Sequence, residues 1–181
     1  MIYVVVGTIV VVFMYIFITY NSLVKANNYV KEAFSTMDIY LKKRWDLIPN
    51  LVEVVKTYAI HEKNVFTEIT NLRSRIYQDL DVNKKISVNE GITSNLLAII
   101  GVAEKYPDLK ANENFMQLSK DLTQIEDEIA NSRKYYNGCV RIFNNKIQMF
   151  PNNLIASIFK FKEASMFEAN VEEKNNVRVE L

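Results

Sequence analysis

The chain begins with a long run of uncharged residues, after which the pattern changes. From Met1 to Val24 no side chain carries a charge, and polar residues are few. As a helix rising about 1.5 Å per residue, this run reaches roughly 36 Å, enough for a hydrocarbon core of about 30 Å. A buried strand or core helix is the alternative, but a soluble core helix normally has a polar face. The pattern predicts a transmembrane helix over residues 1–24.

The predicted span is expected to stay in the protein as a single-pass anchor. A secretory signal peptide has basic residues before its apolar run and a small-residue cleavage site after it. Here neither is present, and the run leads into Tyr20-Asn21-Ser22-Leu23-Val24-Lys25. Lys25 and Lys31 follow the span closely, and cationic residues near a span tend to stay in the cytoplasm. This predicts an outside amino terminus, with everything after the span inside.

Beyond the span, apolar residues recur at steps of three and four from Lys25 to about Asp79. This spacing is typical of a helix in a coiled-coil-like bundle. The predicted seam comprises Val30, Ala33, Met37, Leu41, Ile48, Leu51, Val55, Tyr58, Val65, Ile69, Leu72 and Ile76. Arg44 and Glu62 are charged seam positions. Because a buried charge needs a partner, they predict polar contacts across the core.

Pro49 lies inside this predicted helix. It removes one backbone hydrogen bond and crowds the carbonyl four residues earlier, at Trp45. We expect a kink near Trp45 or a one-residue bulge, and a break into two helices is the alternative; the seam continues in phase across Pro49, which favours the kink. Since no strong breaker separates the span from this helix, both are expected to form one helix of about 80 residues.

A connection and a second helix follow. The polar stretch Asp79–Glu90 is predicted to be a connection. A second helix is predicted from Asn89 to Lys105, ending because the residue before Pro107 is disfavoured in a helix.

The third helix is predicted from Asn112 to Met149, with Asn112 as its N-cap. Its predicted seam comprises Phe115, Leu118, Leu122, Ile125, Ile129, Ser132, Tyr136, Cys139, Phe143 and Phe150. Pro151 ends it, and a short helix is predicted from Asn152 to Phe161.

The expected fold class is all-α. A transmembrane helix over residues 1–24 precedes an up-and-down antiparallel bundle of three long helices and a short C-terminal helix, over residues 25–168. A flexible tail is expected over residues 169–181. The scarcity of helix breakers, 4 glycines and 3 prolines, supports helices over a sheet.

Composition and motifs remove several function classes. The net charge of +1 offers no strong field for nucleic acid. Cys139 is the single cysteine, so it forms no intrachain disulfide. His61, the single histidine, is followed by Glu62 but not by the second histidine of a zinc-protease helix, and Tyr58 stands where a di-iron motif needs a carboxylate. We expect no enzymatic activity, metal or cofactor.

Polar residues gather at positions where a bundle helix would be apolar. They are Arg44, Asp46, Asn50, Glu53 and Glu62 on the first helix, and Glu126, Arg133, Asn137 and Asn144 on the third. Asparagine is a poor helix former, so its presence requires a reason. An internal network that fixes the helix register is one interpretation. An exposed contact surface for a partner or another copy is the second, and a solvated face the third.

The region after the third helix is rich in phenylalanine. Leu154, Ile155, Ile158 and Phe159 form one face of the predicted short helix, with lysines beside it. This face either folds back over the end of the bundle or lies on the membrane surface.

These residues together resemble the LemA family of bacterial membrane proteins. The resemblance is strongest over Leu41-Lys42-Lys43-Arg44-Trp45-Asp46-Leu47-Ile48-Pro49-Asn50-Leu51-Val52. It also includes Tyr106-Pro107-Asp108-Leu109-Lys110-Ala111-Asn112 and Phe150-Pro151, and covers nearly the whole chain. Trp45 and Cys139 differ from the commoner residues there.

The resemblance implies one anchor and a long-helix bundle in the bacterial cytoplasmic membrane, without supplying an activity. Family relatives include magnetosome-membrane proteins, and some are encoded near membrane zinc peptidases. The first hypothesis is a non-enzymatic scaffold that self-associates or organises partners at the bilayer. The second is an adaptor or regulator of a membrane protease. Sensing of a ligand or metal inside the bundle is the weakest, because the core lacks metal ligands.

Overall fold

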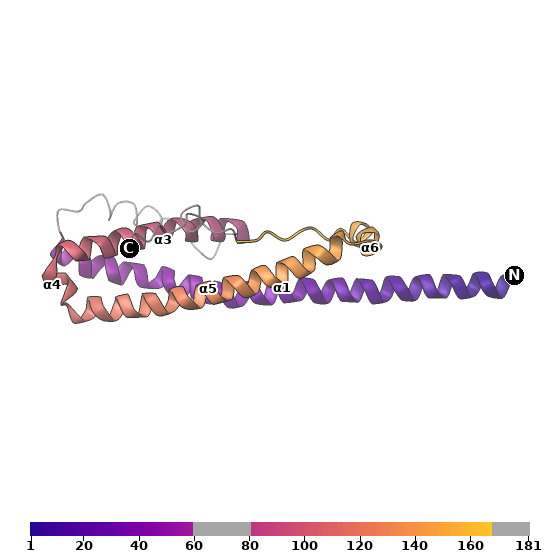
Figure 1. The fold of residues 1–181 in the computed structure, drawn as a ribbon, viewed down its shortest axis with the longest axis horizontal. Coiled ribbons are helices and arrows are strands. Elements are labelled where there is room, and N and C mark those ends of the chain that lie inside the picture. Colours follow the sequence, from indigo (N-terminus) through magenta and orange to yellow (C-terminus); the bar gives the residue numbers. More distant parts are fainter. Residues whose placement is uncertain (60–80, 168–181) are drawn as a thin grey trace, which may run out of the picture. The chain divides into compact units, whose positions relative to one another are not determined.

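The computed structural model describes residues 1–59 and 81–167, and the regular structure in these residues is helical (Figure 1). The elements are α1 (Ile2–Tyr58), α3 (Val82–Lys105), α4 (Pro107–Lys110), α5 (Glu113–Gln148) and α6 (Asn152–Ile158). The all-helical class is confirmed. The prediction of three long helices is wrong: α1 has 57 residues and α5 has 36, whereas α3, which follows the Asp81 cap and ends before Pro107, has 24.

Helix α1 is a single helix from the apolar run through to Tyr58, as expected for that part of the chain. It continues through Pro49, so the alternative of two separate helices is wrong. Leu51 and Val55 are buried on the far side of Pro49, and this packing holds the helix in phase although Pro49 donates no hydrogen bond. The kink itself stays a prediction. The seam positions from Val65 onward lie outside the described residues.

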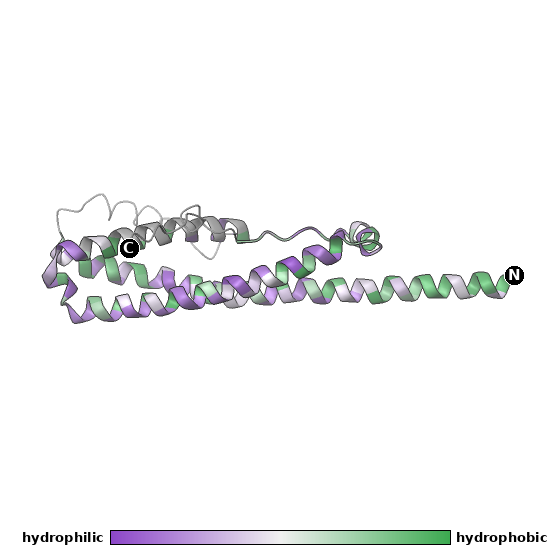
Figure 2. Ribbon diagram, viewed as in Figure 1, coloured by the Kyte–Doolittle hydropathy of each residue, from purple (hydrophilic) through white to green (hydrophobic). Residues whose placement is uncertain are grey.

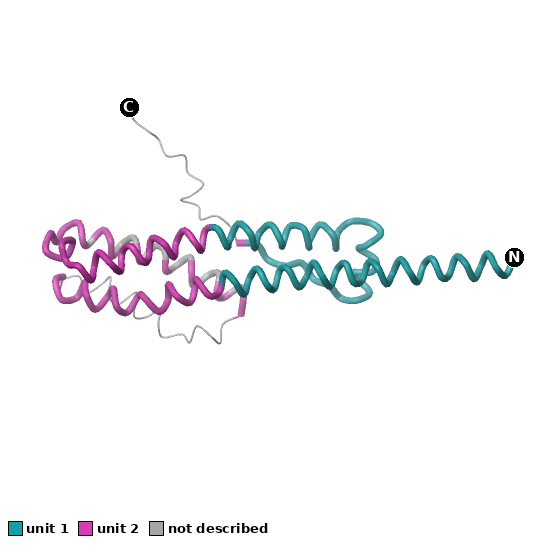
Figure 3. The backbone as a smooth tube through the Cα atoms, turned by 90° about the horizontal axis from the view of Figure 1, so that it is seen from below, with its two compact units in different colours: residues 1–37, 131–166 teal, residues 38–130, 167–181 magenta. Residues whose placement is uncertain are grey.

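The chain divides into two compact units, drawn in different colours in Figure 3. In unit 1, residues Met1–Met37 pack with residues Asn131–Met166. The rings of Phe34 and Tyr136 meet edge to face at 5.8 Å between centroids. Nearer the amino terminus, Lys146 Nζ donates to Ser22 Oγ at 2.9 Å. These pairs run in opposite directions along the two helices, so α1 and α5 are antiparallel in unit 1.

The predicted seam of α5 shifts within unit 1. Tyr136 and Phe143 are buried as predicted, but Cys139 is only half-buried and Phe150 is exposed. Val140 and Ile147 are buried in their place. A straight helix with 3.6 residues per turn drifts by about 20° per heptad against a 3.5-residue repeat. The buried stripe therefore moves by one position toward the end of the helix.

Unit 2 comprises residues Asp38–Ala130 and Phe167–Leu181, with a hydrophobic core from α1, α3, α4 and α5. Its buried members are Ile48, Leu51, Val52, Val55, Ala59, Ile92, Leu96, Ile99, Ala103, Leu109, Phe115 and Leu122. Tyr58, a predicted seam residue, is exposed at the rim, where its hydroxyl accepts a hydrogen bond from Asn112 Nδ2 at 3.0 Å.

Helix α3 runs parallel to α1 in unit 2, so the predicted antiparallel arrangement of the first two helices is wrong. Lys85 contacts Asp38, and Asn89, further along α3, contacts Arg44, further along α1. The ribbon in Figure 1 shows the same direction for both helices.

The caps explain where the helices begin. Asp81 accepts a hydrogen bond from the backbone N–H of Lys84 at 2.9 Å, so α3 starts at Val82. The connection predicted over Asp79–Glu90 is therefore wrong from Val82 onward. Asn112 caps α5 as predicted, because its Oδ1 accepts from the Phe115 N–H at 3.0 Å.

The first part of α1 exposes a continuous apolar surface, seen as the mostly green segment near the N label in Figure 2. Nearly all the side chains in its most apolar window are exposed. By length and composition this helix can cross a membrane, a property shared by membrane anchors and signal sequences.

Helix α6 follows a turn at Phe150-Pro151, whose peptide bond is cis. Just after the end of α6, Lys160 adopts a left-handed conformation (φ 58°), and the Phe161 N–H donates to the Ala156 carbonyl at 2.9 Å. This is the pattern of a Schellman cap. The segment from Phe161 to Phe167 has no regular structure. The predicted tail, 169–181, lies outside the described residues.

Candidate functional site

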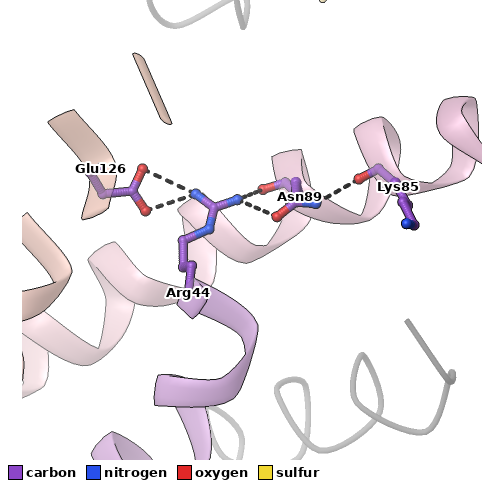
Figure 4. A network of polar contacts seen from close by, with 4 residues as sticks. All are labelled: Arg44, Lys85, Asn89 and Glu126. Carbon is purple, nitrogen blue, oxygen red and sulfur yellow. Dashed lines mark hydrogen bonds and ion pairs between the residues drawn. The ribbon is translucent and has the colours of Figure 1, made fainter. Parts of the chain in front are cut away.

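A charged group, the guanidinium of Arg44 on α1, is fully buried in unit 2. The side chain is 0% exposed. Its Nη1 donates to both carboxylate oxygens of Glu126 on α5, at 2.7 and 3.1 Å. Its Nη2 donates to the backbone oxygen and to Oδ1 of Asn89 on α3, at 2.9 and 2.6 Å (Figure 4). One side chain thus joins three helices, and we call Arg44, Asn89 and Glu126 the arginine clamp.

The clamp is oriented by a second set of contacts on α3. Asn89 Nδ2 donates to the Lys85 carbonyl at 2.8 Å, which turns Oδ1 toward Arg44. Lys85 Nζ in turn lies 2.7 Å from Asp38 Oδ2. Helix α3 is therefore tied to α1 at two levels, which fixes the register between them.

The clamp is electrostatically asymmetric. Arg44 is fully buried, whereas the Glu126 side chain is 37% exposed. Burying an ion is costly unless it is paired and hydrogen-bonded, and here Nη1 is paired with the Glu126 carboxylate while Nη2 is hydrogen-bonded to Asn89. Breaking such a pair from the exposed side would leave the arginine buried without its counter-ion. The arrangement specifies which helices meet at this level of the core.

The structure separates the other predicted polar residues. Asp46 and Asn50 are exposed on α1, and Glu62 lies outside the described residues. Arg133 and Asn137 are half-buried in unit 1 and each has at least one polar, ionic or ring interaction there.

Asn144 binds the chain after α6 in unit 1. Its Nδ2 donates to the Ala164 carbonyl at 2.9 Å, and its Oδ1 accepts from the Ala164 N–H at 3.0 Å. The side-chain amide thus pairs with both backbone groups of Ala164. The predicted polar residues therefore make separate local contacts, which are distributed over the two units.

Asn89 is the clamp residue that sequence reasoning missed. It fell at the end of a segment predicted to be a connection, where an asparagine needs no explanation. A signal was present: Asp81 is a strong N-cap candidate, and a helix starting there would place Asn89 one turn after Lys85.

An open groove of about 740 Å³ lies between α1 and α5 in unit 2. Its lining residues are Tyr40, Lys43, Asp46, Leu47, Asp121, Gln124, Ile125, Asp127 and Glu128. The lining includes four carboxylates, one lysine and the apolar side chains of Tyr40, Leu47 and Ile125. Lys43 lies over the Tyr40 ring, with Nζ 5.4 Å from the centroid. The groove has the chemistry to hold a segment that is basic on one side and apolar on the other.

The predicted face of the short helix divides in the structure. Ile155 is buried in unit 1, whereas Leu154, Ile158 and Phe159 are exposed. One side of α6 therefore packs on the protein, and the remaining apolar side chains point outward.

Two tyrosines of α5 have shifted ionisation. Contact with the Cys139 thiol is the main cause that raises the pKa of Tyr135. Burial raises the pKa of Tyr136 above its usual value of 10.0, and its hydroxyl donates to the Ser165 carbonyl at 2.9 Å. Within residues 1–59 and 81–167, no cluster of three or more His, Cys, Asp or Glu side chains is placed to hold a metal ion.

The exposed apolar part of α1 and the buried Arg44 contacts of unit 2 define a helical protein. Its amino-terminal helix is long and apolar enough to cross a membrane. The LemA family model matches residues 33–181, and the chain belongs to the LemA family.

Named relatives extend this finding. Protein LemA of Metamycoplasma hominis is 28% identical over 158 residues, covering 87% of this chain and 72% of that protein. Magnetosome protein MamQ 2 of Paramagnetospirillum magneticum is 23% identical over 175 residues, covering 82% of this chain. MamQ of Magnetospirillum gryphiswaldense is 21% identical over 174 residues. The match spans 64% of the length of each of these two MamQ proteins.

Proposed function

We propose that this protein is a non-enzymatic, membrane-anchored helical scaffold that self-associates or organises partner proteins at the bacterial cytoplasmic membrane. The observation that carries the proposal is the double character of α1, which has an exposed apolar stretch before Tyr20 and contributes Arg44 to the buried clamp. The clamp's charged groups bind one another, so they hold helices together and leave no free reactive group for a substrate.

The anchor has a defined orientation in this proposal. Lys25 and Lys31 are exposed on α1 directly after the apolar stretch, where cytoplasmic lysines are enriched. The amino terminus would then lie outside and the bundle in the cytoplasm. Protease added to right-side-out vesicles should leave the bundle intact, and protease added to inverted vesicles should digest it. Digestion from the outer face would reverse the topology.

Self-association is the first activity to test. The full chain, purified in detergent and in lipid nanodiscs, should have a mass by light scattering larger than that of one copy. A strict monomer in both media would remove self-association and leave the binding of other proteins.

The groove between α1 and α5 supports the second candidate, an adaptor or regulator of a membrane protease. Its lining combines acidic and apolar side chains, a composition that suits a basic amphipathic segment of a partner. A membrane peptidase that co-purifies with the full chain would support this candidate. Asp127→Lys with Glu128→Lys should then abolish the co-purification.

The matched control keeps the change in charge but moves it away from the groove. Glu53→Lys with Glu104→Lys alters two exposed carboxylates outside the groove lining. This variant should retain the partner. Equal loss in both pairs would show that net charge, and not the groove, governs the interaction.

A further inference from the structure

Exposed apolar side chains gather at the turn between α5 and α6 and along α6. We call this group the apolar corner, and its exposed members are Met149, Phe150, Leu154, Ile158 and Phe159. Phe150 is 77% exposed and Ile158 is 71% exposed. Contiguous apolar patches of this kind are rare on monomeric soluble surfaces and mark contact sites.

Two contacts fix the apolar corner beside the end of the apolar stretch of α1, all within unit 1. Tyr15 Oη donates to Asn152 Oδ1 at 2.9 Å, at the first residue of α6. The Tyr20 ring packs on Phe159, at the end of α6, with 4.6 Å between centroids. Helix α6 therefore lies along the Tyr15–Tyr20 level of α1.

That level is where a membrane surface would fall. Tyrosine rings settle at the interface between hydrocarbon and water. From Ile2 to Tyr20 the helix rises about 27 Å, close to a hydrocarbon thickness of about 30 Å. Tyr15 lies about 7.5 Å below Tyr20 along the helix, which matches the depth of about 5–10 Å at which interfacial helices bury their apolar face.

Positive charge collects on the water side of the same level. Lys160 and Lys162 are exposed directly after α6, and Lys25 is exposed one turn beyond the Tyr20 level on α1. Lysines placed beside an apolar interfacial surface attract anionic lipid headgroups. Along the axis of α1, the apolar corner comes first and the lysines follow. Acyl chains and headgroup phosphates come in the same order in a bilayer.

We propose that the apolar corner is a second membrane contact, in which α6 lies in the interface of an anionic bilayer on the side where the anchor emerges. Phe150, Leu154 and Ile158 enter the acyl boundary, and Lys160 and Lys162 bind headgroup phosphates. The inference rests on the proposed anchor. It adds that unit 1 is held to the bilayer at two points, so its orientation to the surface is fixed and not merely tethered.

The test places an environment-sensitive fluorophore on single cysteines of the full chain carrying Cys139→Ser, reconstituted in phosphatidylcholine–phosphatidylglycerol vesicles. Leu154→Cys and Ile158→Cys report on the apolar corner. Val10→Cys reports on the anchor, and Lys31→Cys is an exposed control on the same unit. Spin-labelled lipids should quench Leu154→Cys and Ile158→Cys as well as Val10→Cys, with blue-shifted emission, and should leave Lys31→Cys unquenched.

Each outcome separates the two proposals. Quenching at Val10→Cys without quenching at Leu154→Cys and Ile158→Cys overturns the membrane contact and retains the anchor. Loss of quenching at Val10→Cys overturns the anchor itself. Blue-shifted emission at Leu154→Cys without lipid quenching shows that protein, such as a second copy, covers the corner, and this also overturns the inference.

Headgroup selectivity provides a second readout. Removing phosphatidylglycerol from the vesicles, or introducing Lys160→Ala with Lys162→Ala, should reduce quenching at Leu154→Cys while leaving Val10→Cys unchanged. The paired control is Lys42→Ala with Lys43→Ala in unit 2, which removes the same charge and should have no effect. Unchanged quenching with the Lys160→Ala and Lys162→Ala pair would remove the headgroup contact from the proposal.

Discussion

At the scale of single residues, the molecule depends on polar side chains that take the place of apolar packing. Arg44 occupies a seam position where leucine would pack, and Asn144 pairs with a peptide as another backbone would. The buried polar role of Arg44 could be predicted from its place as a charged residue in an apolar stripe. The identity of its partners could not be predicted, because they come from positions 45 and 82 residues further along the chain.

The asymmetry of the clamp predicts an unequal response to mutation. Glu126→Ala should lower the free energy of unfolding by about 3–5 kcal/mol, because Arg44 remains buried without a counter-ion. Arg44→Met should cost less, since the half-exposed Glu126 can regain water and methionine fills the core. Urea unfolding followed by circular dichroism in detergent measures both.

Asp127→Ala is the control for this pair. It removes an exposed carboxylate from the same helix and should change stability by no more than about 0.5 kcal/mol. If Arg44→Met proved more damaging than Glu126→Ala, the unpaired buried charge of Arg44 would not be the main cause of the instability.

Tyr136 predicts a loss of stability in alkaline solution. Its pKa is raised in the folded state, so the folded chain holds the phenolic proton more tightly than the unfolded chain does. The stabilisation is complete below pH 10 and is lost as the pH rises through the folded pKa. Melting temperatures from about pH 8 to pH 11 should therefore fall more steeply in the wild type than in Tyr136→Phe.

At neutral pH we expect Tyr136→Phe to be less stable than the wild type by about 1 kcal/mol, because the hydrogen bond to Ser165 is lost. Parallel melting curves at all pH values would contradict the assignment of this titration to Tyr136.

At the scale of elements, apolar spacing predicted most of the helices. The seam of α1 from Val30 to Val55 is buried nearly as predicted, because a three–four repeat permits one inward face. The errors arose where local signals were mixed. The start of α3 was missed since its aliphatic residues are scattered, and the end of α5 drifted because an ideal helix does not keep a seven-residue repeat.

The Asn144 side chain supplies two of the hydrogen bonds that hold the segment after α6, beside the Tyr136–Ser165 and Gln148–Glu163 contacts. Asn144→Ala removes both hydrogen bonds to Ala164, and leaves the N–H and the carbonyl of this residue without that partner. We expect trypsin to cut at Lys162 several-fold faster than in the wild type, and stability to fall by about 1–3 kcal/mol. Asn145→Ala changes the exposed neighbouring residue, and trypsin should cut this variant at the wild-type rate. Equal rates for both variants would show that packing of the aromatic rings suffices.

At the scale of the whole molecule, the proposed anchor makes the apolar stretch of α1 the part of the chain that holds the protein in the membrane. Val10→Arg with Val11→Arg places two charges at its centre, and each costs roughly 2.5–3.5 kcal/mol on insertion scales. The variant should leave the membrane fraction after alkaline extraction, whereas the wild type should remain. Glu32→Arg with Ser35→Arg, on the exposed part of α1 beyond the stretch, is the control and should remain as well. Retention of the first variant would contradict a transmembrane anchor.

The arginine clamp also implies an order of events while the chain is being synthesised. A ribosome adds roughly 5–20 residues per second, so the 82 positions between Arg44 and Glu126 represent about 4–16 s of synthesis. During that interval the guanidinium has no counter-ion and must stay hydrated, which keeps this part of the core open. If the proposed anchor holds, the apolar stretch, made first, has time to enter the bilayer before unit 2 closes.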